Sequence, residues 1–216
     1  MGGVAEAAVF FCAVLAYLWR LVIPLPWTGL ALAAAIAYSW RRRRLAPADL
    51  GLGWRDLVAS AAEWRCWWIP ITVLFLVLGN RRLLQFSALR SGAVYFAWSA
   101  AQQVVYQSMT YLLLRRRLKA GNAAALSGVA FALAHLPNPV LVPATLLWGA
   151  ASCLLFERRR SIWGLALMQK MLSSMLMWVT PRDLHHGFRI GPYYYLESAG
   201  TFAPPIGQTR PGGNHR

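Results

Sequence analysis

Apolar residues occupy the chain in long runs, and short polar or arginine-rich stretches separate these runs. A helix needs about 20 residues, at about 1.5 Å each, to cross a bilayer core of about 30 Å. Applied to the apolar runs, this length predicts an all-α, polytopic membrane helix bundle of about seven spans. The predicted spans cover residues 4–21, 26–40, 67–78, 91–114, 123–136, 140–156 and 162–179.

The same pattern divides the chain into three regions. Residues 1–88 hold three spans and a mixed polar and apolar stretch, 56–64, which is expected to lie in the membrane interface. Residues 89–180 form the membrane core with the remaining spans. Residues 181–216 form a tail outside the membrane, and its Pro- and Gly-rich end after Ala203 is expected to be disordered. No cleavable signal peptide is expected, because the N-terminus has no basic region before its apolar run.

The composition agrees with a membrane protein, since 58% of the residues are hydrophobic and 13% are charged. Lys and Arg number 22 and Asp and Glu only seven, and residues 64–156 contain no acid. A disordered basic tail is ruled out because it would need low hydrophobicity. A soluble nucleic-acid binder is disfavoured because the arginines cluster between apolar runs.

Three arginine blocks set the predicted orientation. They occupy residues 41–44, 115–117 and 158–160, and each follows an even-numbered span. The positive-inside rule then places the N-terminus in the cytoplasm and the tail on the far side, most naturally in the cell (inner) membrane. The loop with Arg81, Arg82 and Arg90 is an exception to this pattern. The blocks serve either as topology anchors alone or also as a site for anionic lipid headgroups, and both roles need the same charges.

Polar side chains recur at helical spacing within the fourth predicted span. A polar residue inside a bilayer must face protein or water, so such clusters are functional candidates. At i, i+4, i+7, i+8 and i+11 these residues share one face of a helix. They are Ser99, Gln103, Tyr106, Gln107 and Thr110, with Gln102 beside them.

Two further polar clusters lie in other spans. His135 follows Phe131 by four residues and precedes Leu-Pro-Asn-Pro, and Gln169 and Ser173 are four residues apart beside Lys170, whose role is unexplained. Counted along the helices from the nearest boundary residues, Gln103, His135 and Gln169 all lie about 14–20 Å from the same membrane face. A shared polar pocket near the midplane is therefore predicted. The alternatives are that the glutamines are packing contacts between helices and that His135 caps a free carbonyl beside the proline break.

The order and spacing of these clusters resemble the CPBP family of intramembrane proteases, which includes CAAX prenyl endopeptidases and bacteriocin-processing or immunity proteins. The resemblance covers residues 90–180. The family's first motif, Glu-Glu-x-x-x-Arg, is replaced by Gln102-Gln103-Val-Val-Tyr-Gln107, whereas Phe131-Ala-Leu-Ala-His135 matches the second, Phe-x-x-x-His. Gln169-x-x-x-Ser173 takes the place of the third motif, His-x-x-x-Asn.

The resemblance implies a site built on His135, Gln102, Gln103, Gln107, Gln169 and Ser173. The family is understood to use a glutamate and histidines to activate a water that attacks a peptide carbonyl, with the arginine and asparagine positioning groups. Of these groups only His135 is kept here. A carboxamide donates and accepts hydrogen bonds, but it does not titrate and cannot act as a general base.

Two functions remain open at this point. One is a relative that has lost its catalytic glutamates and binds a peptide, a lipid or a partner membrane protein. The other is an active intramembrane peptidase with a variant site on His135, in which Gln103, Gln107 and Gln169 position water or substrate. The expected partners are the lipid bilayer, with anionic lipids at the arginine clusters, and a membrane or prenylated peptide, and no nucleic acid.

The tail contains further groups that are able to do chemistry. If it folds back over the bundle, His185 or His186 joins His135, and Arg189 supplies an oxyanion donor. The alternative is a segment at headgroup level, where Tyr and Arg are common. A metal is not expected, because the two histidines have no third ligand at a suitable spacing. Cys12, Cys66 and Cys153 show no metal-ligand spacing either and are read as buried thiols, and no cofactor is predicted.

Overall fold

The computed structural model of this chain describes residues 3–53, 58–59, 69–70, 73 and 86–198. Regular structure in these residues is helical throughout, as predicted. The predicted span 67–78, the interfacial stretch 56–64 and the end of the tail after Ala203 lie largely or wholly outside the described residues. The main helices are α1 (Gly3–Ala16), α2 (Thr28–Arg42), α4 (Phe86–Tyr106), α5 (Leu112–Arg115), α6 (Ala120–Leu133), α7 (Leu141–Arg159) and α8 (Ile162–Val179).

Shorter elements complete these helices. A π-helical turn, Tyr17–Leu21, extends α1, and a second, Gln107–Tyr111, joins α4 to α5 without a break. The tail forms α9 (Arg182–His185), a 3-10 turn (His186–Phe188) and α10 (Pro192–Ser198). The predicted span 123–136 ends earlier than expected, at Leu133, so His135 lies in the turn beyond α6. The physical reason is that Pro137 and Pro139 prevent the helix from continuing.

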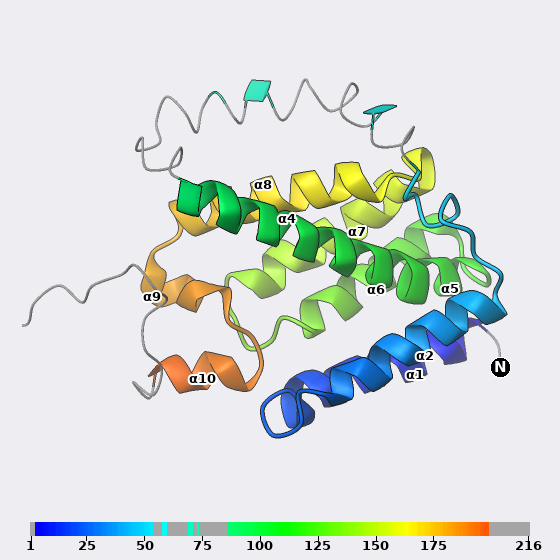
Figure 1. Cartoon of the computed structure of the whole chain (residues 1–216), viewed down its shortest axis with the longest axis horizontal. Coiled ribbons are helices and arrows are strands. Elements are labelled where there is room, and N and C mark those ends of the chain that lie inside the picture. The colour runs from blue at the N-terminus through cyan, green and yellow to red at the C-terminus, as the bar shows by residue number, and fades with distance from the viewer. Residues whose placement is uncertain (1–2, 54–57, 60–68, 71–72, 74–85, 199–216) are drawn as a thin grey trace, which may run out of the picture.

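The core of the bundle consists of α4, α6, α7 and α8. Figure 1 shows α1 and α2 as a hairpin along one side of this core, and α9 and α10 at the end opposite the N-terminus. The backbones of α6 and α7 approach each other closely where two glycines face each other. A Cβ on Gly128 would lie 2.7 Å from the Leu146 carbonyl oxygen, and a Cβ on Gly149 would lie 3.0 Å from the Gly128 Cα. Small residues allow this backbone contact, which is typical of helices that pack within membranes.

Apolar side chains remain exposed around the outside of the bundle, among them Leu30, Val94 and Leu147, which are 74%, 67% and 72% exposed. Among the described residues one helix, Gly3–Leu21, is long and apolar enough to cross a membrane. The glutamines of α4 and the Gln169–Lys170 pair of α8 lower the mean hydropathy of those two helices.

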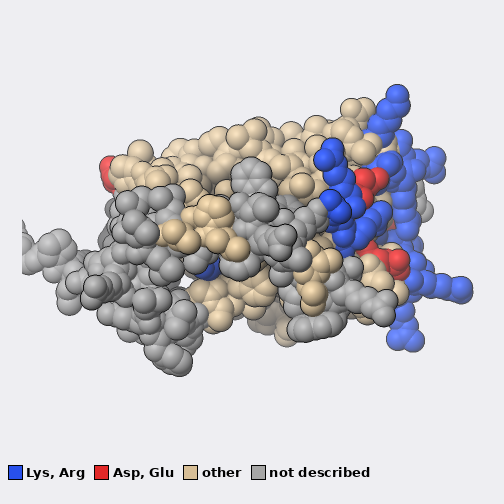
Figure 2. All heavy atoms as spheres, turned by 90° about the horizontal axis from the view of Figure 1, so that it is seen from above, with Lys and Arg blue, Asp and Glu red and all other residues tan. Residues whose placement is uncertain are grey.

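Basic residues gather at one end of the molecule. The arginine blocks stand at the C-terminal ends of α2, α5 and α7. Figure 2 shows most of the visible Lys and Arg side chains together at this end, which in Figure 1 is also the end where α1 begins. The prediction that the three blocks share one side of the bundle is therefore confirmed, and α9 and α10 lie at the opposite end.

Candidate functional site

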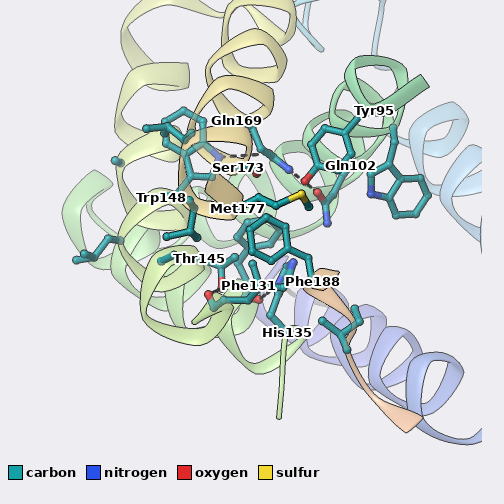
Figure 3. Close-up of a pocket in the computed structure, with 18 of the residues that line it drawn as sticks. Tyr95, Gln102, Phe131, His135, Thr145, Trp148, Gln169, Ser173, Met177 and Phe188 are labelled. Carbon is teal, nitrogen blue, oxygen red and sulfur yellow. Dashed lines mark hydrogen bonds between the residues drawn. The ribbon is translucent and has the colours of Figure 1, made fainter. Parts of the chain in front are cut away.

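A cavity of about 810 Å³ lies between α4, α7, α8 and the turn that follows α6. Gln102, His135, Gln169 and Ser173 line it, so four of the six predicted site residues share one cavity. Figure 3 shows Gln102 and Gln169 on one wall and His135 with Phe131 on another. The described residues that line this cavity include no Asp or Glu.

The other two predicted residues, Gln103 and Gln107, lie behind the cavity wall and are fully buried. They belong to a chain of carboxamides that we call the amide relay. Gln107 Nε2 donates to Gln103 Oε1 at 3.0 Å, and Gln103 Nε2 donates to Gln169 Oε1 at 2.6 Å. Gln169 Nε2 then donates to Gln102 Oε1 at 2.5 Å. The relay therefore crosses from α4 to α8 and returns to α4.

The direction of the relay determines what it presents to the cavity. Because each amide uses its N–H toward the next carbonyl, the last member, Gln102, keeps its own amide N–H₂ as a donor. Figure 3 shows this nitrogen pointing into the cavity. Two neighbouring side chains also bond to the relay: Gln107 Nε2 donates to Ser152 Oγ at 3.3 Å, and Trp148 Nε1 donates to Gln169 Oε1 at 3.2 Å. Chained hydrogen bonds polarise one another, which strengthens the terminal donor.

The π-helical turn Gln107–Tyr111 begins at the last glutamine of the first motif. Its five residues are all buried. A π turn hydrogen-bonds from i to i+5 and shifts the side chains that follow it around the helix. The predicted stripe of Ser99, Gln103, Tyr106, Gln107 and Thr110 is buried throughout, in agreement with the requirement that it face protein.

His135 is buried and held by its own chain. Its Nδ1 lies 2.7 Å from the Phe131 carbonyl oxygen, and its ring meets the Phe131 ring edge-on at 4.7 Å between centroids. A carbonyl oxygen can only accept, so Nδ1 carries the hydrogen and Nε2 keeps a lone pair in the neutral ring. The four-residue spacing of the Phe-x-x-x-His motif thus sets both the position and the tautomer of the histidine.

The tail folds back over the bundle, as one of the two alternatives predicted, and it brings backbone and apolar side chains to the cavity. Gly187, Phe188 and Ile190 line the cavity, whereas His185 and His186 do not. His185 Nδ1 accepts from Gly187 N at 2.9 Å, and the ring of His186 packs against Tyr194. Neither histidine therefore joins His135.

Arg189, the third accessory residue, also lies outside the cavity lining. Its carbonyl oxygen is fixed by Asn138, a residue that sequence reasoning missed. Asn138 is fully buried, and its Nδ2 donates to the carbonyl oxygens of His185 at 2.8 Å and Arg189 at 3.1 Å. Its position between two prolines was the available signal, because a polar residue in such a turn commonly bonds to backbone.

A second cavity, of about 380 Å³, lies between the α1–α2 hairpin and α4 with α6. Its lining is almost entirely apolar and includes Phe10, Leu32 and Val105. Five residues line both cavities, so the two meet at the candidate site: Trp98, Gln102, Phe131, His135 and Ile190. Sequence reasoning gave no sign of this second cavity, nor of Thr145 in the first, because neither depends on a polar stripe.

A metal centre has no support in the described part of the chain, where no three His, Cys, Asp or Glu residues come together as a group able to hold an ion.

Comparison with known families shows that residues 84–175 match the family model described as type II CAAX prenyl endopeptidase Rce1-like. The matched region contains the whole amide relay and His135. No curated protein and no solved structure shows a significant match to the chain.

Proposed function

Because residues 84–175 match the family model of Rce1-like type II CAAX prenyl endopeptidases, we propose that this chain is a membrane-embedded relative that binds a peptide carrying an apolar chain and does not hydrolyse it. The observation that carries the proposal is the amide relay. Each position where the family places an ionisable or charged group in its first and third motifs holds a neutral group here, and the four glutamines among them hydrogen-bond to one another. Hydrolysis needs a general base, which carboxamides cannot supply.

Binding needs different groups, and these are present. The Gln102 amide is a donor for a peptide carbonyl, and Ser173 and His135 lie on the same cavity. The apolar cavity that meets this one at His135 offers space for a long hydrocarbon group, and its walls are almost purely apolar. A peptide with a lipid modification, such as a prenyl chain, has both a polar and an apolar part and matches this pair of cavities.

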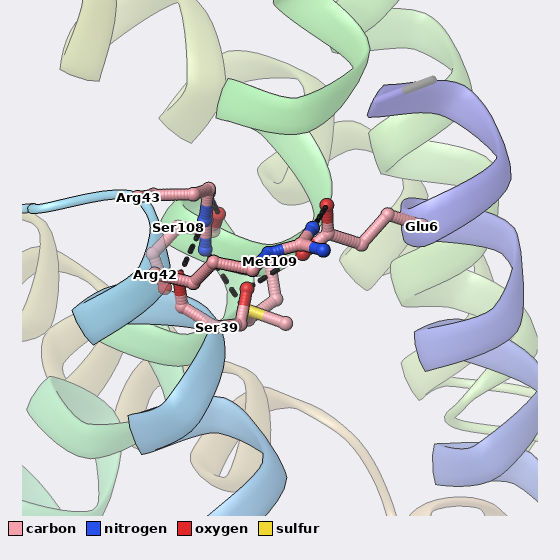
Figure 4. A network of polar contacts seen from close by, with 6 residues as sticks. All are labelled: Glu6, Ser39, Arg42, Arg43, Ser108 and Met109. Carbon is pink, nitrogen blue, oxygen red and sulfur yellow. Dashed lines mark hydrogen bonds and ion pairs between the residues drawn. The ribbon is translucent and has the colours of Figure 1, made fainter. Parts of the chain in front are cut away.

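We also propose that the chain crosses the cell (inner) membrane about seven times, with its N-terminus in the cytoplasm. The support is the gathering of the arginine blocks at the end where α1 begins (Figures 1 and 2). Two acids at this end, Glu6 and Glu157, form ion pairs with Arg42 and Arg115, and the exposed arginines leave the surface strongly basic. Figure 4 shows Glu6 accepting from Ser39 at 2.6 Å and from Arg42 at 3.0 Å, while Arg43 donates to the Ser108 carbonyl at 2.8 Å.

The exposed arginines of this end, such as Arg41, Arg116 and Arg159, are suited to anionic lipid headgroups. We therefore include anionic lipids among the proposed partners. Substituting two blocks by glutamine is expected to weaken the binding of anionic lipids to the purified protein in neutral detergent micelles and to leave the binding of neutral lipids unchanged.

A second function, an active peptidase, is favoured by one feature of His135. The Phe131 carbonyl fixes its hydrogen on Nδ1, and the lone pair on Nε2 is the form that a general base needs. In this alternative Nε2 takes a proton from water, and the Gln102 amide donates to the oxygen of the attacked carbonyl.

The two functions are separated by one experiment in proteoliposomes with a farnesylated CAAX peptide. We expect the wild type to bind the peptide without cleaving it, and the double substitution Gln102→Glu/Gln103→Glu to gain no cleavage. Cleavage by the wild type that His135→Ala abolishes would overturn the proposal and establish the peptidase. Ser173→Ala should weaken binding about three- to tenfold, which corresponds to one hydrogen bond. Ser174→Ala is the matched control, because the Ser174 hydroxyl donates to Lys170 O on its own helix and does not line the cavity.

A further inference from the structure

The segment from His185 to Ile190, which we call the lid, covers the place where the two cavities meet. Gly187, Phe188 and Ile190 line the larger cavity, and Ile190 also lines the apolar one. Figure 3 shows the Phe188 ring beside His135. The side chains of the lid therefore stand where a ligand that reaches both cavities has to pass.

Hydrogen bonds to one buried side chain hold the lid at both of its ends. Asn138 Nδ2 donates to the carbonyl oxygens of His185 and Arg189, at 2.8 and 3.1 Å. Asn138 Oδ1 meanwhile accepts from the backbone N–H groups of Val140 and Leu141, at 3.1 and 3.0 Å, and so caps the start of α7. The two halves of this one amide thus have separate tasks: the oxygen begins a helix, and the nitrogen fastens the lid.

In the closed position the backbone of the lid adopts an unfavourable conformation. His186, Gly187 and Phe188 follow one another with φ of 47°, 61° and 60°. The left-handed region is unfavourable for residues with a Cβ, and two of these three have one. The closed lid therefore persists because the hydrogen bonds to Asn138, and the one from Gly191 N to Leu136 O at 2.8 Å, outweigh this strain.

We propose that the lid closes the cavity of His135 in the resting protein and that a ligand enters after the lid has released Asn138. This inference rests on the proposed function only in treating the cavity as the ligand site. Strain in the closed form and a latch made by a single side chain give a segment that opens as a unit, with the rest of the bundle unchanged. Release removes Ile190 from the wall between the two cavities.

The test is thiol labelling of the full chain in liposomes, with no peptide present. Thr145 lines the cavity and is 8% exposed, so Thr145→Cys reports on access through the lid. The background carries Cys12→Ser and Cys66→Ser, and it keeps Cys153, which is fully buried and does not line the cavity. Labelling of Cys153 by N-ethylmaleimide then reports on general unfolding.

Two substitutions open the lid by different means, and each has a control of the same kind. Asn138→Asp keeps an oxygen for the α7 cap and removes the donor to the lid, and Asn122→Asp is the same change at an exposed position of α6. Gly187→Ala and Gly121→Ala both place a Cβ in open space, with nothing within 4 Å, but only Gly187 has a positive φ.

We expect labelling at position 145 to become about tenfold faster or more with Asn138→Asp. Gly187→Ala should raise the labelling rate about fivefold or more, because a residue with a Cβ is unfavourable in the left-handed conformation of position 187 in the closed lid. Both controls should stay at the rate of the parent, and Cys153 should stay unlabelled in all variants. The lid would be overturned if the parent were labelled as rapidly as both variants. It would also be overturned if the variants accelerated the labelling of Cys153 as well as that of position 145. Because no peptide is used, a failure of the lid is distinct from a failure of peptide binding.

Discussion

Replacing the central member of the amide relay tests whether the relay holds α4 against α8. Gln103→Leu removes a donor to Gln169 Oε1 at 2.6 Å and an acceptor for Gln107 Nε2 at 3.0 Å. Leucine fills a similar space but can do neither. A hydrogen bond between membrane helices contributes about 0.6 kcal/mol on average and up to about 1.7 kcal/mol. Two such bonds, both fully buried, predict a loss of about 1–3 kcal/mol in the free energy of unfolding.

The sharper quantity is the coupling between the two glutamines that join the helices. A double-mutant cycle of Gln103→Leu and Gln169→Leu isolates it, with unfolding in mixed micelles followed by tryptophan fluorescence. We expect a coupling of about 1 kcal/mol. Ser174→Ala replaces Gln169→Leu in the control cycle, because Ser174 bonds only to Lys170 O on α8. A coupling below about 0.3 kcal/mol, indistinguishable from the control, would show that the relay contributes nothing to the packing of α4 on α8.

Two further predictions concern stability. Gly128→Ala should lower the free energy of unfolding by about 1–3 kcal/mol, because its Cβ would meet the Leu146 carbonyl oxygen at 2.7 Å; Gly121→Ala has no atom within 4 Å of its Cβ and should stabilise by up to about 1 kcal/mol in the same assay. At the arginine-rich end, partial burial raises the pKa of Glu157. Hydrogen bonds from Tyr111 and Arg115, together with the charge of Arg115, outweigh the effect of burial and lower this pKa below its usual 4.5. A pKa that is lower in the folded state stabilises the fold at pH values above the pKa of the unfolded state. This stabilisation disappears as the pH falls through the pKa of the folded state. Glu157→Gln should therefore cost about 1 kcal/mol or less at neutral pH and progressively less below about pH 4.5, and a cost that grows on acidification would contradict the assignment.

The sequence predicted the helices well wherever an apolar run had clear limits. Residues 162–179 were predicted as a span, and α8 has the same bounds. Prediction was poorer at the end of α6, where helix periodicity suggested that His135 continues the helix although two prolines follow it. The alternative in which His135 caps a free carbonyl beside the proline break agrees with the hydrogen bond between its Nδ1 and the Phe131 carbonyl oxygen.

The candidate site was only partly accessible to this reasoning. Equal depth predicted a shared pocket for Gln103, His135 and Gln169, and of these His135 and Gln169 line the cavity, with Gln102 in place of Gln103. Depth alone does not say which glutamine of the Gln102–Gln103 pair faces the cavity and which one faces α8. That choice depends on the rotation of α4, to which sequence gives no direct access. The role of Asn138 in the tail was out of reach for another reason: the carbonyl oxygens to which its Nδ2 donates lie 47 and 51 residues away in sequence.

The hydrogen bonds of the relay bear on how the substituted motifs should be understood. In the relay Gln103 accepts from one neighbour and donates to the next, and Gln169 does the same. An ionised carboxylate only accepts, so a glutamate at position 103 would place its oxygen against the Gln169 carbonyl at the present 2.6 Å contact. Restoring this family residue therefore breaks the bond to Gln169 and leaves the carboxylate with only the bond that Gln107 Nε2 donates. The amides are mutually dependent, as expected of a site that has become adapted to neutral groups and not of an enzyme that has lost a single residue. For this reason we expect the reverted glutamate pair to be less stable than the wild type while gaining no hydrolysis.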